Sequence, residues 1–109
     1  DPMSQVIHLS TQAFDKAAGR PQPVLIDFWA PWCGPCRMQG PLLDEVAEAM
    51  GDKALVAKVN VDDEPQLAAQ FGIQSIPTLV VLKDGRIHQR MVGLQPVHNL
   101  LAALQQAGA

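Results

Sequence analysis

Short apolar runs alternate with stretches of helical periodicity along the whole chain. Runs of about four to eight apolar or alternating residues predict strands, whereas apolar residues three or four positions apart predict amphipathic helices. The expected strands cover residues 6–9, 23–29, 54–61, 78–82 and 86–92. With helices between them the predicted order is β-α-β-α-β-α-β-β-α, which is typical of an α/β or α+β domain.

Residues that cap or end helices flank each periodic stretch, so four helices are expected. They begin at Ser10 or Thr11, after Cys33, at Asp63 or Glu64, and at Pro96, and the first three end at Gly19, Gly51 and Gly72. The run at 23–29 is apolar except for one acid, as in a strand covered on both faces, and is expected at the centre of the sheet. Asp84-Gly85 predicts a tight hairpin turn between the last two strands.

Length and charge limit the possible classes of protein. A chain of 109 residues, 48% of them hydrophobic, is long enough for one core and too short for two, so residues 1–109 are expected to form a single domain. Asp1-Pro2 is interpreted as a cloning remnant before an initiator Met3. The net charge of −3 comes from interspersed acids and bases, which argues against nucleic acid as a partner. No apolar run approaches the roughly 20 residues of a membrane span, and no signal peptide is recognisable, so a cytoplasmic protein is expected.

The two cysteines of the chain stand three residues apart at the start of a predicted helix. This spacing places both sulfurs on one side of the first turn, where a disulfide can open and close. The helix N-terminus stabilises negative charge, so Cys33 is expected to be the nucleophile, and Cys36 would attack the mixed disulfide and release the reduced partner. Gly34 leaves room for that partner, and Pro35 occupies a position where its missing N–H costs the helix nothing.

Two other interpretations of the cysteine pair are weaker. A structural disulfide would constrain little in so short a loop and would not persist in a reducing compartment. A zinc site needs two further ligands, and His8, His88 and His98 show no paired spacing. We therefore expect no metal site.

Three segments together resemble the thioredoxin family. They are DFWAPWCGPC at 27–36, Ile76-Pro77-Thr78 and Val92-Gly93, which are similar to the active-site strand, the cis-proline loop and the glycine loop of that family in order and spacing. The similarity extends over essentially the whole chain from about Val6. It implies a thioredoxin fold, with a central mixed sheet of mostly five strands flanked by four helices.

The resemblance also implies an activity. A thioredoxin is a monomeric dithiol carrier that reduces protein disulfides, and it binds no cofactor because its own cysteines carry the electrons. The expected partners are disulfide-containing client proteins and a thioredoxin reductase. That reductase would be a flavoprotein with FAD that draws on NADPH, or a ferredoxin-linked enzyme in some organisms.

Asp27 is the acid within the apolar strand, and burying an acid is costly unless it is paired or protonated. The resemblance implies that this carboxyl group shuttles the proton of Cys36, through water. Lys58, on the following strand, matches the family's lysine beside the acid. The alternative is that Asp27 and Lys58 are only a structural pair.

The resemblance implies a docking surface beside the cysteines as well. The Ile76-Pro77 bond would be cis and would leave the backbone of Ile76 free to pair with an extended client. The surface is expected to be flat and mostly apolar, which suits varied protein partners. Its expected residues are Trp32, Gly34, Pro35, Ile76, Pro77, Gly93 and Leu94. Family members usually carry alanine in place of Leu94, so the alternative for Leu94 is ordinary loop chemistry.

Two rival functions use the same residues. An oxidant or isomerase on the same fold is disfavoured, because oxidising members commonly carry a histidine in place of Gly34-Pro35. A binding subunit that acts without redox chemistry would use the docking surface alone.

In the second helix, Gly40 replaces the commoner alanine before Pro41, and this Gly-Pro pair is expected to loosen that turn.

Overall fold

A five-stranded sheet runs through the middle of the molecule, with the strands in the order β1-β3-β2-β4-β5. The computed structural model describes residues 5–109, so the interpretation of Asp1, Pro2 and Met3 lies outside the described residues. The strands are β1 (Ile7–His8), β2 (Val24–Trp29), β3 (Leu55–Asn60), β4 (Thr78–Lys83) and β5 (Arg86–Val92). β3 pairs in parallel with β1 and β2, whereas β4 is antiparallel to both β2 and β5. The expected mixed sheet is thereby confirmed.

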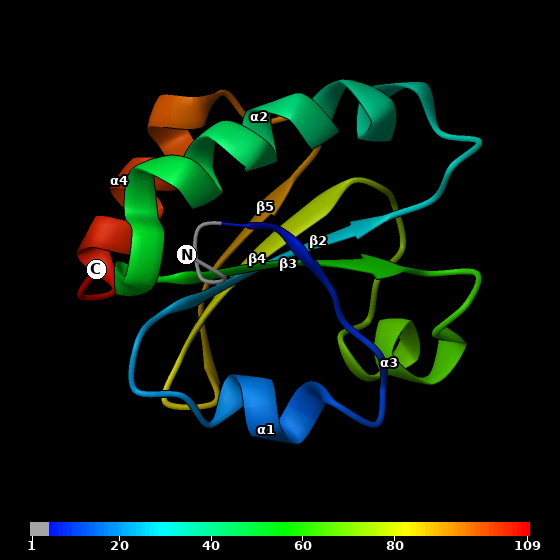
Figure 1. The fold of residues 1–109 in the computed structure, drawn as a ribbon. Coiled ribbons are helices and arrows are strands. Elements are labelled where there is room, and N and C mark those ends of the chain that lie inside the picture. The colour runs from blue at the N-terminus through cyan, green and yellow to red at the C-terminus, as the bar shows by residue number, and fades with distance from the viewer. Residues whose placement is uncertain (1–4) are drawn as a thin grey trace.

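Helices cover both faces of this sheet (Figure 1). α1 (Phe14–Ala18) and α3 (Pro65–Gln70) lie on one face, and α2 (Gly34–Met50) and α4 (Val97–Gln106) lie on the other. A short 3-10 turn at Gly51–Lys53 links α2 to β3. Within residues 5–109 no helix is both long and apolar enough to cross a bilayer.

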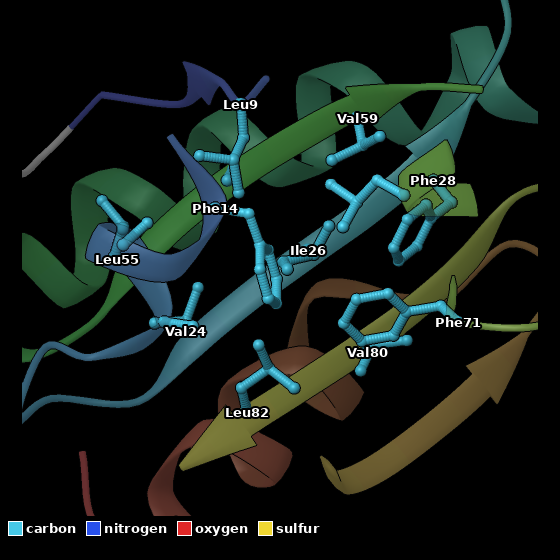
Figure 2. Close-up of a cluster of buried hydrophobic side chains, with 14 residues drawn as sticks. Leu9, Phe14, Val24, Ile26, Phe28, Leu55, Val59, Phe71, Val80 and Leu82 are labelled. Atoms are coloured by element: carbon cyan, nitrogen blue, oxygen red, sulfur yellow. The ribbon is translucent and has the colours of Figure 1, made fainter. Parts of the chain in front are cut away.

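The central strand β2 divides the core into two clusters because its side chains alternate between the faces of the sheet. Val24, Ile26 and Phe28 belong to the cluster beneath α1. Figure 2 shows the rings of Phe14 and Phe71 in that cluster, and the centroid of Phe71 lies 5.1 Å from that of Phe28. Leu25 belongs to the opposite cluster, which includes buried residues of α2 and α4. Asp27 follows Leu25 by two positions, so it faces α2.

The structure has the predicted elements in the predicted order, and the main differences are at the N-terminal end. β1 has two residues instead of the four expected over 6–9. α1 begins at Phe14, later than the predicted caps Ser10 and Thr11. Ser10 Oγ instead accepts a hydrogen bond from Ala13 N–H at 3.2 Å, and Thr11 N–H donates to Glu64 Oε1 at 2.7 Å. These two polar groups therefore stabilise a turn before the helix.

Candidate active site

Three loops meet at one edge of the sheet because of how the strands are oriented. β2 and β3 are parallel and both end at this edge, with Trp29 paired to Asn60. β4 runs the other way and begins there, and β5 ends there, with Thr78 paired to Val92. The segments after β2, before β4 and after β5 are therefore brought together.

The cysteine pair lies where the chain passes from β2 into α2. Cys33 and Cys36 are joined by a disulfide, with their Cα atoms 5.2 Å apart. Cys33 has extended backbone geometry and is the N-cap of the helix, and its sulfur accepts a hydrogen bond from Cys36 N–H at 3.3 Å. Cys33 is 7% exposed and Cys36 is fully buried. Of the two residues only Cys33 therefore has any exposed surface, and it lies where backbone N–H groups stabilise negative charge.

The remaining residues of the motif leave the approach to Cys33 open. Gly34 is half-buried and Pro35 is exposed. A Cβ atom added to Gly34 would meet no atom within 4 Å.

Arg37 is exposed, and its Nη1 donates to the carbonyl oxygen of Pro31 at 3.1 Å, which holds a cation beside the motif.

The loop before β4 lies against the cysteine pair. The Ile76-Pro77 peptide bond is cis, as the resemblance implied. Cys33 Sγ is 3.7 Å from the carbonyl oxygen of Ile76. The carbonyl oxygen of Pro77 accepts a hydrogen bond from Gly93 N–H at 2.8 Å, and Gly93 has a φ of +90°, which glycine adopts without strain. Ile76 thus lies against Cys33, and the next residue of its loop, Pro77, is bonded to Gly93.

Asp27 is fully buried beneath α2. Burial raises the pKa of its carboxyl group from 3.8 to about 7, and the positive charge of Lys58 partly opposes this rise. Neither carboxyl oxygen has a hydrogen-bond partner among residues 5–109. Lys58 is the neighbour of Asp27 on β3, and its Nζ lies 4.0 Å from the centre of the Trp29 ring. The structure therefore brings Asp27 and Lys58 together, whereas proton transfer with Cys36 stays a prediction.

The expected docking residues differ in exposure: Trp32, Pro35 and Leu94 are exposed, Gly34, Ile76 and Gly93 are half-buried, and Pro77 is buried. Trp32 is 68% exposed and Leu94 is 39% exposed. The indole N–H of Trp32 donates to Asp62 Oδ2 at 2.8 Å. Asp62 N–H in turn donates to Asn60 Oδ1 at 2.9 Å, so the exposed indole is held by the segment that follows β3.

Sequence reasoning missed Asp62, Asn60 and Gln39. The parallel pairing of β2 and β3 was the signal for the first two, because it places the residues after both strands at the same edge. Gln39 is fully buried in α2, and its carboxamide bonds to the backbone of Gln95. The amino-acid sequence gives this glutamine no distinction from its neighbours.

No group of three or more His, Cys, Asp or Glu side chains that could hold a metal ion occurs within the part of the chain that the structure describes.

Comparisons with known proteins agree with this geometry. The family model described as Thioredoxin matches residues 5–106. The chain is 52% identical over 96 residues to a thioredoxin of Alicyclobacillus acidocaldarius, covering 88% of this chain and 91% of the relative. It is 43% identical over 105 residues to a thioredoxin of Haemophilus influenzae, covering 95% and 98%. The solved structure of a mutant thioredoxin from Halobacterium salinarum has a TM-score of 0.90 at 32% identity, and the match covers 98% of this chain and 94% of that one.

Proposed function

The chain belongs to the thioredoxin family and is a protein-disulfide oxidoreductase, and on that premise we propose that it is a dithiol carrier in which Cys33 attacks and Cys36 resolves. The observation that carries the proposal is the asymmetry of the two sulfurs. Cys33 is accessible and caps α2, whereas Cys36 is fully buried one turn further on.

The proposed reaction has two exchange steps. The Cys33 thiolate attacks one sulfur of a client disulfide, forms a mixed disulfide and releases one client thiolate. Cys36 loses its proton and attacks Cys33 Sγ, which re-forms the Cys33–Cys36 disulfide and releases the second client thiolate. Two electrons pass to the client, one client thiolate takes up the proton that Cys36 released, and the other takes up a proton from water. The Cys36 N–H that already bonds to Cys33 Sγ stabilises the starting thiolate.

We assign the acceptance of the Cys36 proton to Asp27. A carboxyl group whose pKa is raised to about 7 can both take and return a proton near neutral pH. Lys58 is the cation beside it and favours its ionised form. Asp27→Ala is expected to slow the decay of the mixed disulfide at pH 7 while leaving its formation unchanged. Rapid quenching measures the decay of the mixed disulfide over time. If Asp27→Ala leaves this decay unchanged, Asp27 and Lys58 are only a structural pair.

We further assign client docking to the residues around the disulfide. An extended client segment would pair with the backbone of Ile76 beside Cys33, and its side chains would contact the mostly apolar surface around them. That surface is formed by Trp32, Gly34, Pro35, Ile76, Gly93 and Leu94, whereas Pro77 is buried and contributes through the cis bond that presents Ile76. The alternative that Leu94 is an ordinary loop residue predicts that Leu94→Ala leaves client preference unchanged.

Family membership supports a proposal for the electron source of the carrier and for the compartment in which it acts. Thioredoxins bind no cofactor themselves, so the oxidised form needs an external source of electrons. We propose that this source is a thioredoxin reductase with FAD and NADPH, and that the protein acts as a monomeric single domain in the cytoplasm.

The first experiment determines the direction of electron flow. The protein is equilibrated with glutathione buffers, and the fluorescence of Trp29 and Trp32 reports the fraction that is oxidised. This fraction gives the reduction potential of the Cys33–Cys36 pair. We expect a value below that of glutathione, together with reduction of insulin that Cys33→Ser abolishes. A value above that of glutathione would make the protein an oxidant or isomerase.

A further inference from the structure

Gln39 occupies a position in α2 that the helix otherwise fills with apolar side chains. The buried residues of α2 follow a helical stripe formed by Cys36, Gln39, Leu43, Val46, Ala47 and Met50. Gln39 is fully buried in this stripe, one turn beyond Cys36. Burying a carboxamide is unfavourable unless its donor and acceptor are both bonded, so its partners indicate what it does.

The carboxamide of Gln39 is paired with the backbone of one residue, Gln95, in the loop after β5. Its Nε2 donates to the carbonyl oxygen of Gln95 at 2.9 Å, and its Oε1 accepts from Gln95 N–H at 2.8 Å. This reciprocal pairing resembles that of two residues in adjacent strands, so it fixes the orientation of the loop as well as its distance. We call it the Gln39 clamp.

The clamp and the Pro77–Gly93 bond hold the two residues that flank Leu94. Gly93 N–H is bonded to Pro77 on one side, and Gln95 is bonded to Gln39 on the other. The side chain of Gln95 strengthens the same loop, since its Nε2 donates to the carbonyl oxygen of Gly93 at 3.2 Å. The loop of the docking surface is therefore tied to the cis-proline loop and to the helix that carries both cysteines.

We propose that Gln39 is a positioning residue that holds the loop at 93–95 in the conformation that clients bind. The proposal rests on the proposed function, since it concerns how protein clients dock at the same disulfide. A loop fixed in advance loses less conformational entropy when an extended client binds beside it. Gln39 thus acts on client affinity, while the exchange chemistry at Cys33 does not depend on it.

The test compares Gln39→Met, which keeps the length of an unbranched side chain and removes both polar atoms, with wild type. Reduced protein is mixed with excess insulin and, separately, with the small disulfide 5,5′-dithiobis(2-nitrobenzoate), which does not span the docking surface. We expect the half-saturating insulin concentration to rise about tenfold, as for the loss of two hydrogen bonds, with the limiting rate, the small-disulfide rate and the reduction potential unchanged.

Val46→Ala is the matched control, because it removes buried atoms from the same helix stripe without touching the clamp. It is expected to lower stability and leave both rates unchanged. An equal loss with both disulfides in Gln39→Met, or no loss with insulin, overturns the role of Gln39. A wild-type protein that reduces neither disulfide refutes the proposed function itself.

A second measurement needs no variant. In the oxidised wild-type protein the Gln95 amide is expected to exchange its hydrogen about a hundredfold more slowly than an unprotected loop amide. Exchange at the unprotected rate would mean that the clamp does not form in solution, and would overturn the proposal even if Gln39→Met did not fold.

Discussion

Replacing Asp27 by Asn should remove a large pH dependence of stability. The folded state raises the pKa of this carboxyl group from 3.8 to about 7. At about 1.4 kcal/mol for each tenfold change in proton affinity, that rise corresponds to about 4 kcal/mol. The free energy of unfolding of the wild type should therefore contain a contribution of this size that depends on pH and that Asp27→Asn lacks.

The sign follows from which state binds the proton more tightly. Between pH 4 and pH 7 the folded protein holds a proton on Asp27 that the unfolded chain has released, so the wild type loses stability as the pH rises through this range. Above about pH 7 the carboxyl group is ionised in both states and the loss is complete. Asp27→Asn should gain about 4 kcal/mol relative to wild type between pH 4 and pH 8.

Chemical denaturation of the oxidised proteins at several pH values measures this difference, with far-UV circular dichroism as the signal. A new buried amide can shift the absolute stability of the variant but cannot make it depend on pH in this range. Asp44→Asn, on the exposed side of α2, is the matched control for the loss of a carboxylate. A difference between Asp27→Asn and wild type that stays constant from pH 4 to pH 8 would refute the reasoning.

Three further predictions concern the site and the helix behind it. Cys36→Ser should accumulate a mixed disulfide with insulin that is visible on a non-reducing gel; its absence would contradict the assignment of Cys36 as the resolving thiol. Gly40→Ala should raise the free energy of unfolding by about 1 kcal/mol, because alanine favours a helix interior. The added Cβ would lie 3.9 Å from Lys58 Nζ, which is an ordinary contact. A lower free energy of unfolding, measured with denaturant, would reveal a clash. Asp62→Ala removes the acceptor of the Trp32 indole and should raise the KM for insulin about threefold to tenfold, whereas an unchanged KM would mean that this bond does not orient Trp32.

Local patterns were sufficient to predict most of the fold. The apolar run at 23–29 became β2, buried on both faces as expected, and Asp84-Gly85 forms the hairpin turn with positive φ at both residues. The beginning of α1 was not predictable in this way. Thr11 N–H donates a hydrogen bond to Glu64, 53 residues away. No local sequence pattern indicates a hydrogen-bond partner at that separation.

The site was predictable to the extent that its chemistry lies in a contiguous motif. Cys33 and Cys36 were found from their spacing, and the disulfide confirms that they are close enough to exchange. The cis bond at Pro77 came only from the family resemblance, because the sequence by itself favours trans. Gln39 depends on a contact with Gln95, 56 residues away, so it required the assembled fold, whereas the parallel pairing of β2 and β3 could have placed Asp62 near Trp32.

The antiparallel pairing of β4 with β2 also determines where added sequence would be tolerated. Val24, at the start of β2, pairs with Leu82 at the end of β4, so the Asp84-Gly85 turn lies at the edge of the sheet opposite the disulfide. The six residues of β2 separate the two edges by about 20 Å. A passenger peptide spliced into this turn would enter and leave through neighbouring strands and would project away from approaching clients. The same chain would then carry the passenger at one end while it exchanges disulfides at the other.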